Sequence, residues 1–277
     1  MSLDTPARIA ILGAGPTGLE AALYARFLGY DCDVYERGRV GENLLLRGRQ
    51  PLAVPWRLIP SPLGLEALAA QDPSWQPPAD DAVLTCEEIV ARYYLPLAQS
   101  DLLVDGVRTQ TRVLSVSREG PSGKSLARED LRGDETRADH PFRILLRGAG
   151  GEEQVATADA VLDCTGLDDA ASSNGTERGE PTRQDPPHPA LSHRGRGFSE
   201  DLLAPLQTEL LEPAGSSAVG PARLLRVEPD FYILGAKSSG GSVEFTFADG
   251  LVQVRDLFTI IGDRATLDLY ATMRPLR

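Results

Sequence analysis

Three glycines near the start of the chain have the spacing of a nucleotide-binding turn. Gly13, Gly15 and Gly18 form a G-x-G-x-x-G pattern directly after a short apolar run that suits a buried parallel strand. In such a turn the first glycine permits a tight bend, the second lets a pyrophosphate approach backbone N–H groups, and the third lets helix and strand pack closely. Pro16 and Thr17 begin the predicted helix, whose positive N-terminal end favours an anion.

An acidic residue follows at the distance expected for ribose recognition. Glu36 lies 23 residues after Gly13, at the end of a second predicted strand over residues 31–36. Its carboxylate can accept hydrogen bonds from both ribose hydroxyls and would repel a 2′-phosphate, so the site favours FAD or NAD over NADP. Strand, glycines, helix, second strand and acid in this order indicate a dinucleotide site rather than a merely glycine-rich turn.

The stretch after this acid is predicted to be a long loop that crosses the nucleotide site. Residues 37–60 carry arginines, prolines and glycines without a regular apolar period. Arg37, Asn43 and Arg47 are candidates for contacts to ribose or pyrophosphate, although arginines in a loop are more commonly solvated. Trp56 is either an anchor of the loop or a neighbour of a bound ring.

Apolar patterns and turn residues predict the remaining elements. One helix starts at Ser61-Pro62, and a second starts at the capping box of Thr85 and Glu88 and bends at Pro96. Neither helix requires a chemical role. The other predicted elements are strands over residues 109–117, 142–148, 152–158, 158–166 and 230–235, and a helix over 247–261 that ends at Gly262. The backbone N–H groups that start this last helix are expected to stabilise negative charge on a bound ring.

Composition changes abruptly between residues 168 and 222. Proline, glycine, serine and charged residues dominate this segment, which predicts poor order over most of it. His188 and His193 lie there and are expected to be solvated rather than metal-bound. His140 also shows no metal-ligand spacing, and we expect no metal site.

Charge and cysteine content exclude several classes of partner. The net charge of −12 argues against nucleic acid and anionic membranes as partners. Cys32, Cys86 and Cys164 are dispersed without a C-x-x-C pair, so we expect reduced cysteines with packing roles. The first residues lead directly into a strand, and no apolar run approaches the roughly 20 residues of a membrane span. We therefore expect no signal peptide and a soluble, cytoplasmic protein.

In three features the chain resembles FAD-dependent oxidoreductases of the flavin-containing monooxygenase and thioredoxin-reductase-like superfamily, and it is most similar to the monooxygenase-like branch. These features are the glycine fingerprint with its acid, the meander-like strands before VLDCTG, and the late segment DFYILGAKSSG followed by a helix. The resemblance covers residues 6–167 and 224–270. It implies an α/β, Rossmann-like FAD-binding domain with a parallel sheet, helices and a β-meander, discontinuous around a poorly ordered insert.

The resemblance also implies roles for individual residues. The glycine motif would hold the FAD pyrophosphate, the acid would hold the adenosine ribose, and the backbone of Val113 would contact adenine. Cys164-Thr165-Gly166 would pass by the cofactor, with cysteine in place of the usual alanine, and Gly235 with its following turn would approach the isoalloxazine ring. The residues assigned to the cofactor are Gly13, Gly15, Pro16, Thr17, Gly18, Glu36, Arg37, Val113, Thr165, Gly166, Gly235 and Lys237.

Two departures from the family pattern bear on function. The family inserts an NADPH-binding domain with its own glycine motif, but here the interval from Gly166 to Phe231 contains no apolar strand followed by one. We therefore expect an FAD-binding domain in two parts, residues 1–167 and 224–277, joined by a low-complexity linker over 168–223. The chain also lacks the C-x-x-C of thioredoxin-reductase-like relatives, which disfavours dithiol transfer, and no Ser-His-Asp arrangement is apparent.

Two functions remain open from the sequence. In the first, the protein is an FAD-dependent, monooxygenase-like oxidoreductase that acts on a small-molecule substrate, its flavin reduced by diffusible NAD(P)H or by a partner reductase. In the second, it is a non-catalytic FAD-binding protein, a degenerate relative or a flavin sensor. A direct NAD-dependent enzyme is a weaker alternative, because the late strand and helix suit FAD. Loss of the NADPH domain would uncover an apolar face and favour a homo-oligomer.

Overall fold

Five parallel strands form the centre of the molecule. The computed structural model describes residues 3–120, 123–126, 136–166, 221, 224–226, 228–239 and 245–273. The central sheet has the order β3-β2-β1-β7-β8, with all neighbouring strands parallel. Its strands are β1 (Arg8–Leu12), β2 (Asp31–Tyr35), β3 (Val107–Arg108), β7 (Ala160–Asp163) and β8 (Phe231–Ile233).

This strand order is that of a Rossmann-like sheet. The chain moves outward from β1 through β2 to β3, then returns to the other side of β1 as β7 and β8, so the order reverses beside β1. Such a reversal leaves a crevice at the carboxyl ends of the strands, where nucleotides bind in this class of fold. The α/β, Rossmann-like fold predicted from the sequence is therefore confirmed, and β8 from the C-terminal part completes the sheet.

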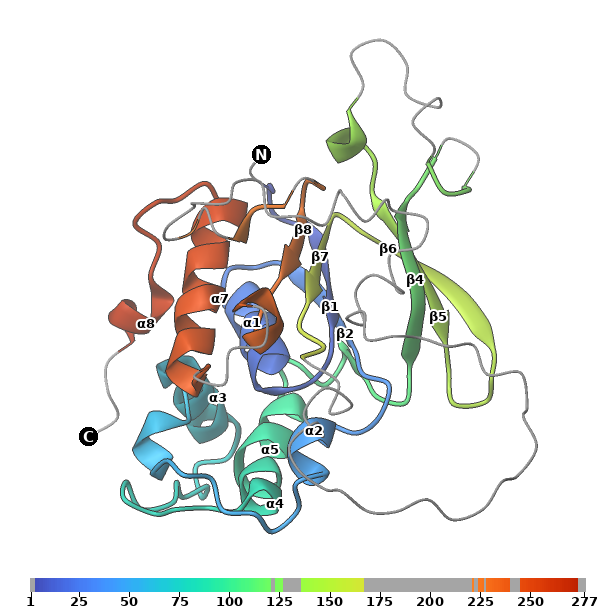
Figure 1. Ribbon diagram of the computed structural model, residues 1–277. Coiled ribbons are helices and arrows are strands. Elements are labelled where there is room, and N and C mark those ends of the chain that lie inside the picture. Colours follow the sequence, from blue (N-terminus) through green and yellow to red (C-terminus); the bar gives the residue numbers. More distant parts are fainter. Residues whose placement is uncertain are drawn as a thin grey trace, which may run out of the picture.

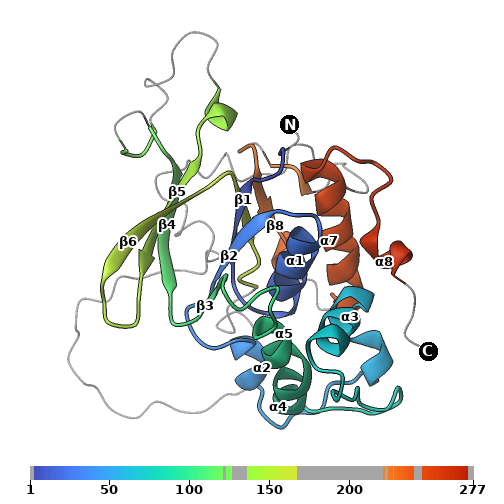
Figure 2. The same ribbon diagram turned by 180° about the vertical axis from the view of Figure 1, so that it is seen from behind.

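A three-stranded antiparallel meander lies on one side of the central sheet (Figures 1 and 2). It consists of β4 (Arg112–Arg118), β5 (Phe142–Arg147) and β6 (Glu153–Ala158), in that order. A turn at residues 148–151 joins β5 to β6, as the glycines there predict. The register between β4 and β5 shifts between Val113 and Ser115, which marks a β-bulge near the start of β4.

Helices cover the other face of the sheet and its carboxyl edge (Figure 1). Helix α1 (Pro16–Phe27) packs between the sheet and α7 (Phe247–Ile261), and short helices gather beyond the strand ends. The remaining elements are α2 (Glu42–Leu45), η1 (Trp56–Leu58), α3 (Pro62–Gln71), α4 (Cys86–Ile89), the π-helical turn η2 (Val90–Tyr94), α5 (Leu95–Ala98), η4 (Arg137–Asp139), η8 (Ala236–Ser239) and α8 (Leu269–Thr272).

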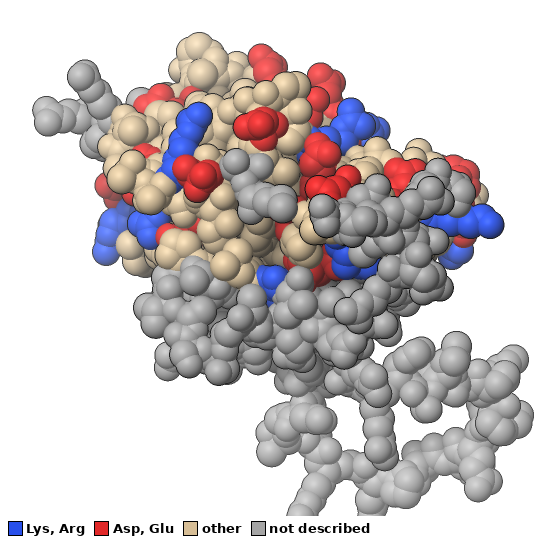
Figure 3. Space-filling model, turned by 90° about the horizontal axis from the view of Figure 1, so that it is seen from above, with Lys and Arg blue, Asp and Glu red and all other residues tan. Residues whose placement is uncertain are grey.

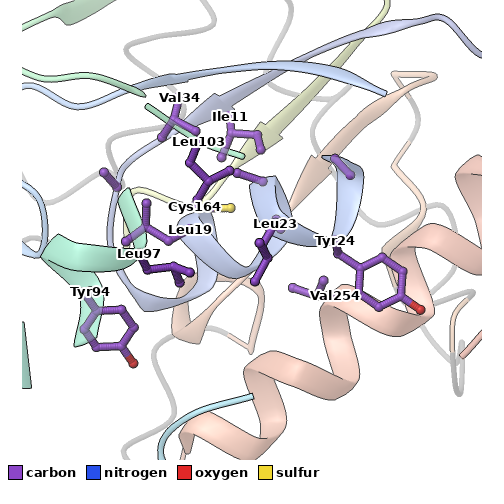
Figure 4. Close-up of a cluster of buried hydrophobic side chains, with 14 of the residues drawn as sticks. Ile11, Leu19, Leu23, Tyr24, Val34, Tyr94, Leu97, Leu103, Cys164 and Val254 are labelled. Carbon is purple, nitrogen blue, oxygen red and sulfur yellow. The ribbon is translucent and has the colours of Figure 1, made fainter. Parts of the chain in front are cut away.

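The side chains of β1 alternate between the two faces of the sheet and divide the core into two halves. Ile9 and Ile11 face the helices, whereas Ala10 and Leu12 face the meander, because successive side chains of a strand point to opposite faces. Figure 4 shows the helix-side half, where Ile11 lies among side chains from α1, α5 and α7. A strand buried on both faces reads as a continuous apolar run, which explains the sequence of β1.

Several predicted boundaries are correct, and one prediction needs revision. Ser61 accepts a hydrogen bond from the Gly64 N–H at the start of α3, and Thr85 forms the predicted capping box at α4. The stretch 37–60 was expected to be a long loop, yet it contains the short helices α2 and η1. The helix that was predicted to bend at Pro96 contains the π-helical turn η2 directly before α5, whose second residue is Pro96.

A buried ionic cluster joins the meander to the segment that enters β8. The Arg118 guanidinium is 1% exposed, and its Nε donates to Glu228 Oε1 over 2.7 Å. Arg137 Nε donates to the other oxygen of the same carboxylate over 2.8 Å. Arg118 also donates to the His140 and Pro229 carbonyl oxygens and lies 3.7 Å from the centre of the Phe142 ring. The cluster fixes where the chain rejoins the sheet.

Charge is mixed over the face that Figure 3 presents, where acidic and basic side chains occur side by side. Within the described residues, no helix is long and apolar enough to cross a membrane. The predicted low-complexity segment, including His188 and His193, falls almost wholly outside the described residues. The domain boundaries predicted at 167 and 224 therefore stay predictions.

Candidate dinucleotide site

One cavity of about 540 Å³ opens at the carboxyl ends of four strands. The ends of β1, β2, β7 and β8 form its floor, and α1, the stretch 37–59, η2 and the start of α7 form its walls. A volume of this size lies in the range of small-molecule and cofactor sites. Among the predicted site residues, those that line the cavity are Gly13, Gly15, Pro16, Thr17, Glu36, Arg37, Val113, Thr165, Gly166 and Gly235.

The glycine turn has the geometry that its three positions predict. Gly13 has φ +99°, a backbone conformation that side chains other than hydrogen rarely allow. A Cβ on Gly18 would overlap the Gly13 carbonyl oxygen, so Gly18 permits α1 to pack on the turn without itself lining the cavity. A Cβ on Gly15 would meet no atom within 4 Å, which leaves open space where a ligand can approach the backbone.

Helix α1 begins without a side-chain cap. Its N-cap is Gly15, no side chain of the described residues caps its first turn, and that turn contains no acidic residue. In contrast, side chains of Ser61, Thr85 and Thr246 cap α3, α4 and α7. The free donors and positive end of α1 face the cavity, which suits an anionic group such as a pyrophosphate.

Glu36 is held in place by the glycine turn itself. Its Oε2 accepts the Ala14 N–H over 2.9 Å, and its Oε1 accepts the Gly38 N–H over 2.8 Å. Each carboxylate oxygen keeps a second lone pair, so both can still accept a hydroxyl from a ribose. The acid at the end of β2 is therefore oriented before any ligand binds.

A second polar cluster fixes the turn after β7. Asp163 is fully buried, and its Oδ1 accepts the Thr165 hydroxyl over 2.6 Å and the Thr165 N–H over 3.1 Å. Lys237 Nζ lies 3.0 Å from Asp163 Oδ2 and 3.1 Å from Thr165 Oγ1. Lys237, which the sequence assigned to the cofactor, does not line the cavity and ties the turn after β8 to the turn after β7; its contact with a cofactor stays a prediction.

Asp163→Asn is expected to lower the free energy of unfolding by about 1–3 kcal/mol, because it weakens the three charge-assisted hydrogen bonds that the carboxylate accepts from Thr165 and Lys237. Burial alone would raise the pKa of Asp163, but Lys237 and the hydrogen bonds from Thr165 and Lys237 outweigh it and hold the pKa below its ordinary value. A lowered pKa means that this stabilisation is complete above the ordinary pKa of 3.8 and is lost as pH falls further. Urea titrations between pH 7 and pH 3 measure this loss of unfolding free energy. If wild type and Asp163→Asn lose the same amount over this range, Asp163 is not the source of the pH dependence.

The start of α7 differs from its predicted role. Thr246 Oγ1 accepts the Asp249 N–H, and the Asp249 carboxylate accepts the Thr246 N–H over 2.8 Å. This capping box occupies donors of the first turn and adds a carboxylate beside it. The start of α7 thus offers an anion less than α1 does, and Phe245 and Phe247 make this end of the cavity apolar.

Several cavity residues were missed or left open by the sequence. Arg37, Asn43 and Arg47 all line the cavity, whereas Trp56 is buried in the core against Tyr93 and does not line it. The cavity residues that the sequence did not single out include Glu20, Arg112, Tyr93, Tyr94, Leu52, Ile59 and Phe245. Of these residues, only Arg112 could have been predicted from the sequence, since it directly precedes Val113. The residues in helices have sequence patterns typical of ordinary packing positions.

The three cysteines are free and buried, and Cys164 lines the cavity. Burial raises the pKa of the Cys164 thiol, so it is not a nucleophile near neutral pH. In the part of the chain that the structure describes, no three or more His, Cys, Asp and Glu side chains gather in an arrangement that could hold a metal ion.

No family model and no curated protein matches the chain. Solved structures that align with it include the bacillithiol disulfide reductase Bdr from Bacillus cereus, with 17% identity and a TM-score of 0.39, over 59% of this chain and 40% of the reductase. An OTEMO complex with FAD and NADP aligns with 20% identity and a TM-score of 0.38, and an oxidised steroid monooxygenase bound to NADP with 23% identity and a TM-score of 0.38. Each alignment covers 59% of this chain and 26% of the other.

The chain therefore spans less than half the length of each of these proteins. Identities below 25% and TM-scores below 0.5 do not decide a shared activity. The assignment of the fold rests on the chain's own strand order and on its turn after β1.

Proposed function

We propose that this protein binds FAD and acts as an FAD-dependent oxidoreductase. The observation that carries the proposal is one cavity that joins three separate features. These are the Glu36 carboxylate, the uncapped start of α1, and the apolar end beside β8 and α7. A nucleotide needs the first two features, and a large aromatic ring at the far end uses the third.

The residues present fit the parts of FAD in the order in which the cavity presents them. Glu36 would accept the adenosine ribose hydroxyls, and the open space at Gly15 would let the pyrophosphate reach the backbone donors of α1. Thr165, Gly166 and Gly235 would lie along the path toward the ring. FAD supplies the hydride and electron chemistry when it is bound, and the protein supplies binding, orientation and exclusion of water.

Gly15→Ala tests the cofactor site without disturbing the fold. Gly15 has φ −83° and free space around its Cβ position, so alanine is expected to leave the free energy of unfolding unchanged or raise it by up to about 1 kcal/mol. The added methyl would stand where the pyrophosphate approaches, and we expect at least a roughly tenfold loss of FAD affinity, equivalent to about 1.4 kcal/mol. Flavin fluorescence quenching and chemical unfolding measure the two effects.

The matching wild-type measurement is the visible spectrum of the purified protein, followed by heat release of its flavin and titration with added FAD. A protein that is colourless and takes up no FAD would contradict the cofactor assignment. Equal FAD affinity of wild type and Gly15→Ala would show that the ligand does not lie against the glycine turn.

The finer activity that we propose is monooxygenase-like oxidation of a small-molecule substrate, with the flavin reduced by diffusible NAD(P)H or by a partner reductase. We propose that the protein works in the cytoplasm, without nucleic-acid or membrane partners, and self-associates. Anaerobic mixing of the FAD-loaded protein with NADPH, NADH and a flavin reductase tests the electron supply. If the protein binds one FAD per chain and none of these reductants bleaches it, the alternative is favoured, a non-catalytic FAD-binding protein.

A further inference from the structure

A buried carboxyl group lies in the wall of the cavity and has no partner of opposite charge within the described residues. Glu20 lies in the second turn of α1, one turn after Pro16, and its side chain lines the cavity although the residue is only 5% exposed. No ion pair of Glu20 occurs in the described part of the chain. A carboxyl group in this setting is expected to hold its proton more tightly than usual.

Four tyrosines surround this carboxyl group. Tyr270 of α8 donates its hydroxyl to Glu20 Oε1 over 2.9 Å, and Tyr24 lies one turn further along α1 and packs against Tyr270. Tyr93 and Tyr94 of η2 also line the cavity, and the Glu20 carboxylate acts electrostatically on both phenols. Burial raises the pKa of all four phenols, so each stays neutral around pH 7 and none supplies a charge.

The charges on the other neighbouring elements are occupied elsewhere. Arg255 of α7 pairs with Asp256 over 2.7 Å and acts on Tyr24 rather than on Glu20. Burial raises the pKa of Glu20 to about 7, and hydrogen bonds from Ser61 and Tyr270 offset only part of the rise. The cavity wall therefore holds a carboxyl group that changes its protonation state near neutral pH.

We propose that Glu20 takes up a proton when a dinucleotide fills the cavity, so that cofactor binding is linked to pH through this residue. This inference rests on the proposed FAD site. A bound ring removes the remaining water from the Glu20 carboxyl, and the pyrophosphate adds negative charge to the same cavity. Both effects favour the neutral acid, whose O–H then becomes a hydrogen-bond donor to an acceptor atom of the bound ring.

Protonation of Glu20 on binding makes the affinity for FAD depend on pH. Binding favours the protonated form, so FAD binds most tightly below pH 7 and more weakly as pH rises above 7. If occupancy raises the pKa by one further unit, the dissociation constant is about eightfold larger at pH 9 than at pH 6. Calorimetry at pH 7.5 in buffers of different ionisation enthalpy should register uptake of a fraction of one proton for each FAD bound.

Glu20→Gln is the decisive variant, because the amide keeps the size of the side chain and a donor but cannot titrate. It is expected to bind FAD with a dissociation constant that changes less than about twofold between pH 6 and pH 9, and with no proton uptake. Glu66→Gln removes the same charge from α3 outside the cavity and should behave as wild type. Tyr270→Phe removes a hydrogen bond that lowers the pKa of Glu20, so it should move the midpoint of the pH dependence upward.

The outcomes separate this inference from the proposed function. Failure to bind FAD at any pH overturns the proposed function itself. FAD binding by the wild type with no proton uptake, or an unchanged pH dependence in Glu20→Gln, overturns the role of Glu20 and leaves the FAD site standing. The calorimetric proton count in the wild type needs no variant, so it decides the question even if a substitution at this buried position impairs folding.

Discussion

Glu228→Gln is expected to lower the free energy of unfolding by about 3–5 kcal/mol, the loss typical of a broken buried ion pair. The Glu228 carboxylate is 0% exposed and accepts from both Arg118 and Arg137. A glutamine offers one oxygen and one NH₂ group, so one guanidinium would face a donor. The Arg118 side chain is itself 1% exposed and cannot regain water without opening the meander. Urea unfolding followed by tryptophan fluorescence measures the change.

The chain contains a matched surface pair for comparison. Arg147 Nη2 lies 2.6 Å from Glu153 Oε1, as close as the buried contact, but both side chains are about half exposed. Glu153→Gln should therefore cost less than about 1 kcal/mol, since water replaces the lost partner. Similar losses in Glu228→Gln and Glu153→Gln would show that burial does not set the strength of the Arg118 cluster.

Gly18→Ala is expected to weaken FAD binding strongly and to destabilise the fold at the same time. A methyl group at this position would overlap the Gly13 carbonyl oxygen and contact the Cys164 side chain, so α1 must move away from the glycine turn. Overpacking of this kind costs about 1–3 kcal/mol of folding free energy. The displaced helix would also withdraw its N-terminal donors, and we expect a loss of FAD affinity of roughly hundredfold or more, about 2.7 kcal/mol.

Comparison with Gly15→Ala separates the two glycines by mechanism. Both variants should bind FAD weakly, but only Gly18→Ala should also unfold at a lower urea concentration. Gly15 faces open space and Gly18 faces backbone, so the same added methyl group has different consequences. A Gly18→Ala protein with wild-type stability would mean that α1 does not pack against the Gly13 carbonyl oxygen.

The part of the fold that the sequence predicted is the part in which the signal is local. The strand, glycine turn and helix at residues 8–27 follow from neighbouring residues, because turn conformation and helix start depend on a few consecutive positions. The boundaries of α7 and the cap of α3 were also predictable, since Thr246 and Ser61 stand directly before the helices they cap. Glu36 was predictable because a fixed β-α-β length brings it to the glycine turn.

The sequence by itself thus determined the glycine turn, the helix that follows it and the acid at the end of β2. Only the tertiary structure decided the rest, because it depends on partners far away in the chain. The sequence did not show that Lys237 pairs with Asp163, 74 residues earlier. The sequence drew no prediction for Glu20, and its hydrogen bond comes from Tyr270, 250 residues later. Burial shifts the pKa of an ionisable group according to the residues that pack against it, and a local sequence pattern does not show which residues those are.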